Sequence, residues 1–219
     1  MDKTEFKSKS IVKKIEYLPL GYKIELIGQF LIATLAAATA ACTTIAIYSN
    51  ITQDVYNIRI LIGSAFGILF SAGWMKYEDY LFKYIKVSML IECLLYAGLF
   101  IYIIVTLDYN TYMLLSVAIG SLVSNIVCPG QNRIHTAITK DEIARNAYSD
   151  ISGIIGSVGV ILGTIFALII NWDIRIAFMV LFPTLIVDDL TSYIQYRILE
   201  KEGKIINNKI IIENEEQVI

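Results

Sequence analysis

Six long apolar stretches, separated by short polar segments, occupy most of the chain. They cover about residues 26–48, 58–75, 87–107, 112–128, 151–170 and 174–196. A helix rises about 1.5 Å per residue, so roughly 20 apolar residues are enough to cross the hydrocarbon core of a bilayer. The pattern predicts an all-α integral membrane protein, a bundle of six transmembrane helices.

The polar segments divide the chain into three parts. Residues 1–25 predict a cytoplasmic amphipathic N-terminal arm, residues 26–198 the six-helix membrane domain, and residues 199–219 a cytoplasmic tail. We expect the Ile-rich piece of the tail, Ile205–Ile212, to be disordered or to lie on the membrane surface.

Helix ends are predicted from the residues that start or stop helices. Lys76–Lys86 is expected to be a loop after the second helix, and Pro129-Gly130 is a strong stop signal for the fourth. Asp150 or Ser152 is placed to cap the start of the fifth helix.

Basic residues lie almost entirely on alternate sides of the apolar stretches. Of the 18 Lys and Arg residues, all but Arg59 and Arg175 fall in segments that would face the cytoplasm. Cytoplasmic loops of membrane proteins retain Lys and Arg. We therefore predict a multi-pass protein of the cell (plasma) membrane with both termini in the cytoplasm.

Composition agrees with a membrane location and excludes several functions. The chain of 219 residues is 56% hydrophobic and 17% charged, whereas soluble domains carry about 25% charged residues. A net charge of −2 argues against a nucleic-acid partner. Cys42, Cys93 and Cys128 lie in separate apolar stretches without metal-ligand spacing, and a metal or catalytic role for His135 is not expected in a cytoplasmic loop. We predict no enzyme, no cofactor and no metal.

Small residues recur at three- and four-residue spacing in the fifth stretch, at Gly153, Gly156, Gly159 and Gly163. Gly120 belongs to a similar stripe in the fourth stretch. Faces of small residues let two helices approach closely in lipid. These glycines are therefore predicted to pack helices together.

Three acids lie inside predicted transmembrane helices: Glu92 in the third, and Asp188 and Asp189 in the sixth. Charged residues at such positions are costly and usually functional. One hypothesis makes Glu92 or an Asp of the pair a proton carrier. The other, which we favour for the Asp pair, is that it marks the inner end of the sixth helix, where water and loop Lys or Arg reach it.

Short motifs follow one another from the end of the fourth stretch into the fifth. They are Cys-Pro-Gly-Gln-Asn-Arg-Ile at 128–134, Ala-Ile-Thr-Lys-Asp-Glu at 137–142, Asn146-Ala147 and the glycines of the fifth stretch; Gly28-Gln29 opens the first. In this order they resemble the N-terminal six-helix half of the major facilitator superfamily, especially its macrolide-efflux and enterobactin-exporter branch. The resemblance extends over about residues 25–199.

The resemblance implies two three-helix repeats, with helices one and four lining a transport cavity. It nominates five residues as substrate contacts: Gln29, Thr34, Thr39, Ser121 and Asn125. The alternative for the hydroxyls is a bond to their own helix or to a neighbour. Because the family has twelve helices, the implied activity is efflux of a small molecule by a half-size subunit, acting as a homodimer or with a second six-helix half.

Two departures from the family pattern favour a different function. The segment 73–79 lacks the family's Asp-Arg order, and Gly156 is followed by Ser157 where a Pro is usual. The alternative is a non-transporting membrane protein, either a truncated or decayed transporter half or an immunity or accessory factor that binds a membrane partner.

Overall fold

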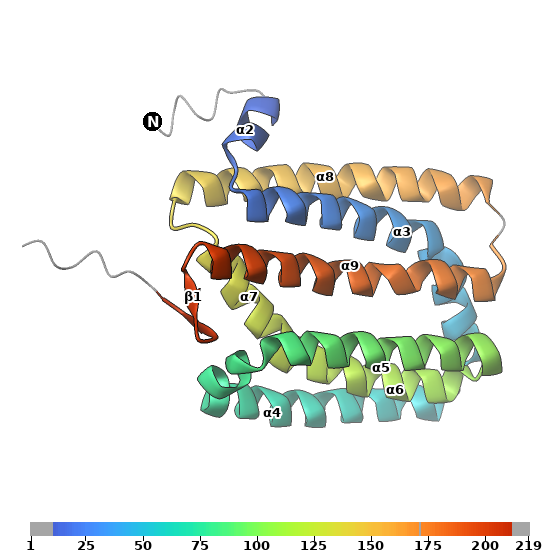
Figure 1. Ribbon diagram of the computed structural model, residues 1–219. Helices are drawn as coiled ribbons and strands as arrows, with labels where there is room; N and C mark the ends of the chain where they lie inside the picture. The colour runs from blue at the N-terminus through green and yellow to red at the C-terminus, as the bar shows by residue number, and fades with distance from the viewer. Residues whose placement is uncertain (1–10, 171, 212–219) are drawn as a thin grey trace, which may run out of the picture.

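The structure, a computed structural model, describes residues 11–170 and 172–211 as a bundle of long helices (Figure 1). Its elements are α2 (Ile11–Tyr17), α3 (Leu20–Asn50), α4 (Gln53–Lys83), α5 (Ile85–Thr106), α6 (Tyr109–Leu122), the π-helical segment η1 (Val123–Val127), α7 (Cys128–Ala137), α8 (Glu142–Ile169), α9 (Ile174–Lys201), β1 (Ile205–Ile206) and β2 (Lys209–Ile210). The outer parts of the predicted arm and tail, 1–10 and 212–219, lie outside the described residues.

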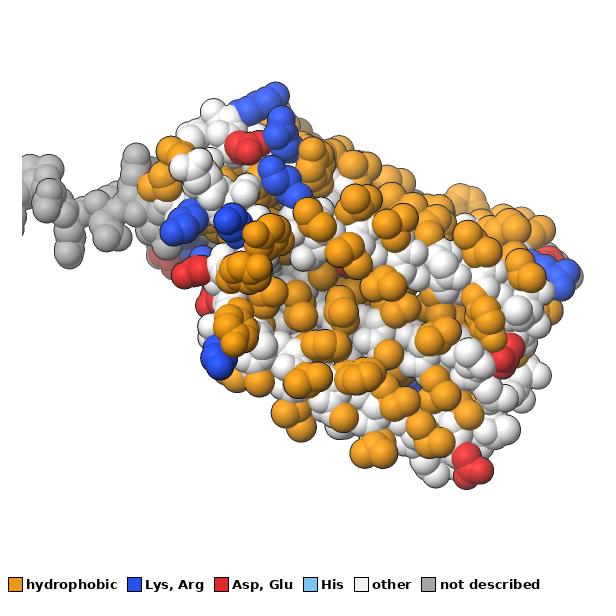
Figure 2. All heavy atoms as spheres, turned by 60° about the horizontal axis from the view of Figure 1, so that its bottom comes forward, with side chains coloured by type: hydrophobic (Ala, Val, Ile, Leu, Met, Phe, Trp, Pro, Cys, Tyr) orange, Lys and Arg blue, Asp and Glu red, His pale blue; other side chains and the backbone are white. Residues whose placement is uncertain are grey.

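The long helices alternate in direction, so the bundle has two distinct ends (Figure 1). α3 packs against α8 and α9, while α4 packs against α6, and α5 joins the two groups through α9. Most Lys and Arg side chains gather at the end where α3 begins (Figure 2). We call this the basic end.

Five of the described helices are long and apolar enough to cross a membrane: α3, α4, α5, the continuous helix Tyr109–Ala137, and α8. Hydrophobic side chains cover the flank of the bundle between its ends (Figure 2). Leu61, Ile68 and Leu168, for example, are 71%, 74% and 83% exposed. An apolar surface this extensive needs lipid or a partner to cover it. The chain is a multi-pass membrane protein built from helices.

Several helices continue beyond the apolar stretches that predicted them. α3 begins at Leu20, within the predicted arm, and α9 continues to Lys201. The expected loop after the second helix is mostly helical, since α4 runs to Lys83 with a kink at Tyr77. Water hydrates polar side chains beyond the lipid, so a helix need not end where its apolar stretch ends.

Pro129-Gly130 does not end the fourth helix, contrary to the prediction. A proline lacks an N–H and crowds the carbonyl four residues earlier. The preceding turn is π-helical, with the N–H of Cys128 donating to the carbonyl of Val123. This wider turn accommodates the proline, and the helix continues as α7. A Cβ at Gly130 would overlap the Ile85 side chain, so glycine lets α7 approach α5 closely.

The cap of α8 also differs from the prediction. Asp141, rather than Asp150 or Ser152, precedes the helix, and its Oδ1 accepts from the N–H of Ile143 at 2.9 Å. Asp150 and Ser152 lie two turns or more inside α8. The Ala137–Glu142 segment is therefore a tight connection between α7 and α8.

The Ile-rich piece of the tail, as far as it is described, is an ordered β-hairpin. Asn207 and Asn208 both have positive φ, 53° and 58°, as a two-residue hairpin turn requires. The hydroxyl of Tyr196 donates to Asn208 Oδ1 at 2.7 Å. Ile205 is buried in a hydrophobic cluster at the basic end that also contains Phe82. The hairpin thus covers that end of the bundle.

Candidate functional site

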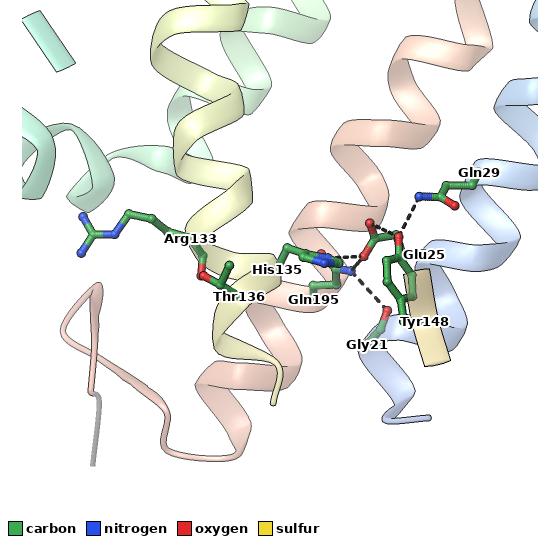
Figure 3. A network of polar contacts seen from close by, with 8 residues as sticks. All are labelled: Gly21, Glu25, Gln29, Arg133, His135, Thr136, Tyr148 and Gln195. Carbon is green, nitrogen blue, oxygen red and sulfur yellow. Dashed lines mark hydrogen bonds and ion pairs between the residues drawn. The ribbon is translucent and has the colours of Figure 1, made fainter. Parts of the chain in front are cut away.

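Glu25 lies where four helices meet near the basic end (Figure 3). Its Oε1 accepts from the hydroxyl of Tyr148 at 2.6 Å. Its Oε2 accepts from Nε2 of Gln195 at 2.7 Å and lies 2.6 Å from Nδ1 of His135. The partners come from α8, α9 and α7, while Glu25 belongs to α3. We call these four residues the Glu25 cluster.

Aromatic rings close the Glu25 cluster on one side. Tyr22 lies about one turn before Glu25 on α3. Its ring stacks on that of Tyr148, with centroids 4.5 Å apart, and its centroid lies 4.9 Å from that of the His135 ring. Gln29 extends the cluster by donating from Nε2 to the Tyr148 hydroxyl at 2.7 Å. Both oxygens of Glu25 have partners. The cluster is therefore suited to hold the four helices together.

A second group of polar side chains lies deeper in the bundle. Glu92 of α5 and Asp189 of α9 are both buried, at 5% and 4% exposure, and their carboxyl groups interact directly. Gln131 of α7 donates from Nε2 to Asp189 Oδ1 at 2.9 Å. The thiol of Cys93 donates to Oδ2 at 3.1 Å. We call these four residues the Glu92 cluster.

The Glu92 cluster is not fully satisfied. Glu92 Oε2 is buried without a hydrogen-bond partner. No ion pair between described residues links Glu92 or Asp189 to a Lys or Arg. Two adjacent carboxyl groups without a cation cannot both be ionised in an apolar environment. The two acids therefore form a candidate proton site.

The favoured interpretation of Asp188-Asp189, that the pair marks the end of its helix, is wrong. α9 continues without interruption to Lys201. Successive residues of a helix point about 100° apart, and here Asp189 faces the bundle while Asp188 is exposed on its surface. Of the two acids, only Asp189 belongs to the Glu92 cluster.

The five predicted substrate contacts do not gather at one place. Gln29 joins the Glu25 cluster. The hydroxyl of Thr34 donates to the carbonyl of Phe30 at 2.7 Å, and that of Thr39 to the carbonyl of Leu35 at 3.0 Å. Both threonines are therefore engaged within their own helix.

Ser121 and Asn125 face α4 instead. Ser121 donates to the carbonyl of Gly63 at 3.4 Å. Asn125 accepts from the Ser71 hydroxyl at 2.5 Å and donates to the carbonyl of Ser121 at 2.7 Å. The bonds to Gly63 and Ser71 join the helix Tyr109–Ala137 to α4, at a contact separate from Gln29.

Of the five glycines predicted to pack helices together, two lie at a contact between described helices. A Cβ at Gly159 would lie 3.0 Å from the carbonyl oxygen of Phe30, and one at Gly163 would overlap the carbonyl of Thr34 in α3. α3 and α8 therefore touch through backbone atoms. A Cβ placed at the other three positions would meet no described atom of another helix within 4 Å: Gly120, Gly153 and Gly156.

Sequence reasoning missed His135, Tyr148, Gln195 and Gln131. His135 lies on helix α7 and not in a loop. Its partner Glu25 is 110 residues away, and Gln131 is 58 residues from Asp189. No local pattern links residues so far apart. The available signal was a polar side chain near each end of an apolar stretch, which needs a buried partner.

Comparison with protein-family models, with curated proteins and with solved structures finds no match. Among the described residues, no group of three or more His, Cys, Asp or Glu side chains is arranged to hold a metal ion. The two polar clusters are therefore the features of the described residues that bear on function.

Proposed function

We propose that this chain is a half-size efflux-type transporter subunit in which Glu92 and Asp189 carry the coupling proton. The observation that carries the proposal is the buried Glu92 carboxyl, which has an unpartnered oxygen and contacts a second acid. A merely structural acid would have its oxygens satisfied, as Glu25 has. A proton shared by two buried carboxyl groups can be released when a conformational change admits water or a cation.

The helix pairing supports a six-crossing bundle made of two inverted repeats. α9 has 28 residues and spans roughly 42 Å at 1.5 Å per residue, which is long enough for a sixth crossing. The main pairings correspond when α3, α4 and α5 are exchanged with the helix Tyr109–Ala137, α8 and α9. The contact of α3 with α8 then corresponds to that of Tyr109–Ala137 with α4, and the contact of α3 with α9 to that of Tyr109–Ala137 with α5. The major facilitator resemblance predicts this arrangement.

The gathering of Lys and Arg at the end that begins α3 and ends α9 supports a cytoplasmic position for both termini (Figure 2). A single bundle does not enclose a cavity between two halves. The proposed transporter therefore acts as a homodimer or with a second six-helix chain in the plasma membrane.

The test compares E92Q with the unchanged protein and with the control E16Q, which alters an exposed glutamate on α2. Each protein is overproduced, and everted membrane vesicles are given an imposed pH gradient, with ethidium and erythromycin as probes. We expect E92Q to abolish gradient-driven uptake and E16Q to leave it unchanged, because an amide has the shape of the carboxyl group but cannot carry its proton. Uptake by E92Q at the unchanged rate would contradict the proposal.

A second readout needs no substrate. Infrared spectra of the purified protein at neutral pH should contain the carbonyl stretch of a protonated carboxylic acid, and this band should be lost in E92Q. Its absence from the unchanged protein would mean that the pair holds no proton.

A second function is favoured by the scattered positions of the five predicted substrate contacts. Without a common polar cavity, the chain would be a non-transporting membrane protein that binds a membrane partner. A strictly monomeric particle in lipid nanodiscs, with no probe uptake in vesicles, would favour this function.

A further inference from the structure

A pocket of about 620 Å³ opens at the basic end of the bundle. Its walls are α7 with the α7–α8 connection on one side and, on the other, the turn and hairpin that follow α9. Four basic side chains and one acid line it: Arg133, Lys140, Arg145, Lys204 and Glu202. The lining is therefore strongly cationic. Neither polar cluster of the transport proposal contributes a residue to it.

The end of α9 fixes Lys204 at the pocket wall. Gly203 has a φ of 72°, and its N–H donates to the carbonyl of Glu200, while the N–H of Lys204 donates to that of Leu199. This is the Schellman geometry, which ends a helix with a left-handed glycine. The Lys204 ammonium group then donates to the carbonyl of Ile138 at 2.9 Å. The bond joins the two walls of the pocket.

Arg145 supplies the second ordered cation. Its Nε donates to the carbonyl of Thr139 at 2.9 Å, which holds the guanidinium group against the α7–α8 connection. No ion pair to a described carboxylate uses the two Nη groups. A guanidinium group fixed through Nε can present both Nη groups to one anion, and this geometry matches phosphate oxygens.

Arg133 lies at the rim and points away from the Glu25 cluster (Figure 3). It pairs with Glu78 and Asp79 of α4 at 3.3 Å each and lies over the Phe82 ring. Its charge is therefore largely offset. Lys204 pairs with Glu202 at 2.8 Å. The rest of the positive charge of the lining comes from Lys140 and Arg145.

The remaining wall is apolar and includes Ala137, Ile210 and Ile211. The pocket also lies where the membrane-crossing helices Tyr109–Ala137 and α8 have their basic ends. A site with both cationic and apolar walls at this level suits an amphiphilic anion, and basic pockets between membrane helices bind anionic lipid headgroups.

We propose that this pocket binds a phosphate group, supplied either by an anionic phospholipid of the adjoining leaflet or by a free phosphate. Arg145 and Lys140 grip the phosphate oxygens. Lys204, which also pairs with Glu202, completes the site from the hairpin side, so that the bound group ties the hairpin to the α7–α8 connection. This proposal does not depend on transport.

The experiment uses the full chain purified in neutral detergent. Thermal unfolding is followed while phosphatidylglycerol, phosphatidylcholine or inorganic phosphate is added, because a ligand that binds only the native state raises Tm increasingly as its concentration exceeds Kd. The variants are R145Q, K140Q and the control K209Q. Lys209 is exposed on the same hairpin and does not line the pocket. Gln at position 145 keeps an amide donor for Thr139, and K140Q serves independently if R145Q does not fold.

We expect phosphatidylglycerol to raise Tm in the unchanged protein and in K209Q, and phosphatidylcholine to have little effect. R145Q or K140Q should need roughly ten to a hundred times more phosphatidylglycerol for the same rise, since a hydrogen bond to a charged group contributes about 1.5–3 kcal/mol. An equal response to inorganic phosphate would identify free phosphate as the source.

Three results would overturn the proposal. The first is an equal response to the two lipids together with no response to phosphate. The second is that R145Q and K140Q both respond like K209Q. The third is a response that appears only after Glu213, Glu215 and Glu216, which follow the hairpin in the sequence, are changed to Gln. In that case the chain's own carboxylates would be the occupant.

Discussion

Glu25 accepts two hydrogen bonds and contacts the ring of His135, whereas Glu92 has a buried oxygen without a partner and contacts another acid. Burial alone does not distinguish their roles. Donors around a carboxylate stabilise its charged form, while a neighbouring acid stabilises the protonated form. At the scale of single residues, the partners therefore distinguish Glu25, which joins helices, from Glu92, which we propose as a proton carrier.

Asp141 lies outside the membrane-crossing helices and can be used to test whether a donor stabilises the charged form of a carboxyl group. Its Oδ2 accepts from the Tyr17 hydroxyl at 2.5 Å, which lowers the pKa of Asp141 below its ordinary value. A lowered pKa in the folded state contributes stability that is complete above the pKa of the unfolded chain, about 3.9, and is lost as pH falls through the folded value.

We therefore expect the Tm of the unchanged protein to exceed that of D141N at neutral pH, with the difference shrinking steadily as the pH is lowered through about 4. Asn also caps helices well, so the substitution removes the charge and keeps the cap. Thermal unfolding in detergent at several pH values measures the difference. A difference independent of pH would show that the Asp141 charge does not stabilise the fold.

At the scale of elements, the contact of α3 with α8 depends on glycines whose backbone touches the backbone of the other helix. Gly163 meets Thr34 and Ala38 in this way, and Gly159 meets Phe30. Gly156, one turn earlier on α8, meets nothing within 4 Å among the described residues. A side chain larger than hydrogen is therefore excluded at position 163 but has room at position 156.

We expect G163A to lower the free energy of unfolding by about 1–3 kcal/mol, because the added methyl group must push α3 away. The control G156A should be neutral or slightly stabilising, since alanine favours helix by about 1 kcal/mol over glycine. Unfolding of the detergent-solubilised proteins by increasing amounts of denaturing detergent compares the two. Equal effects of the two substitutions would contradict the close α3–α8 contact.

At the scale of the whole molecule, the alternation of helix directions and the gathering of basic residues at one end support the proposed six-crossing topology (Figures 1 and 2). This proposal requires α9 to cross the membrane, although α9 is not among the five described helices that qualify by length and composition. Its interior carries Pro183 and the two acids.

Cysteine labelling in intact cells tests this crossing. After the native cysteines are replaced, a single cysteine is introduced as R175C, near the start of α9, or as K209C, in the hairpin; both positions are exposed. An impermeant maleimide should label R175C in intact cells and K209C only after the membrane is opened. Labelling of both from outside would place the two ends of α9 on one side of the membrane.

The sequence predicts the helices because a backbone in lipid must satisfy its own hydrogen bonds. It also identifies Glu92 and Asp189 one by one, since an acid in an apolar run stands out. It does not predict that they meet, or that Gln131 joins them, because such contacts depend on how the helices pack. The sequence predicts helix ends wrongly at Lys76–Lys86 and at Pro129. Polar residues continue α4 to Lys83, and a π-helical turn lets the fourth helix continue past the proline.

The π-helical turn Val123–Val127 sets the direction in which the side chains after it point. Compared with a regular helix, such a turn accommodates one additional residue, and each residue advances the helix by about 100°. Asn125 faces α4, whereas Gln131 and His135 face α9 and α3 further along. A deletion of one residue in this turn would rotate everything after it by that angle, so that both polar clusters would lose their α7 members while every helix remained intact.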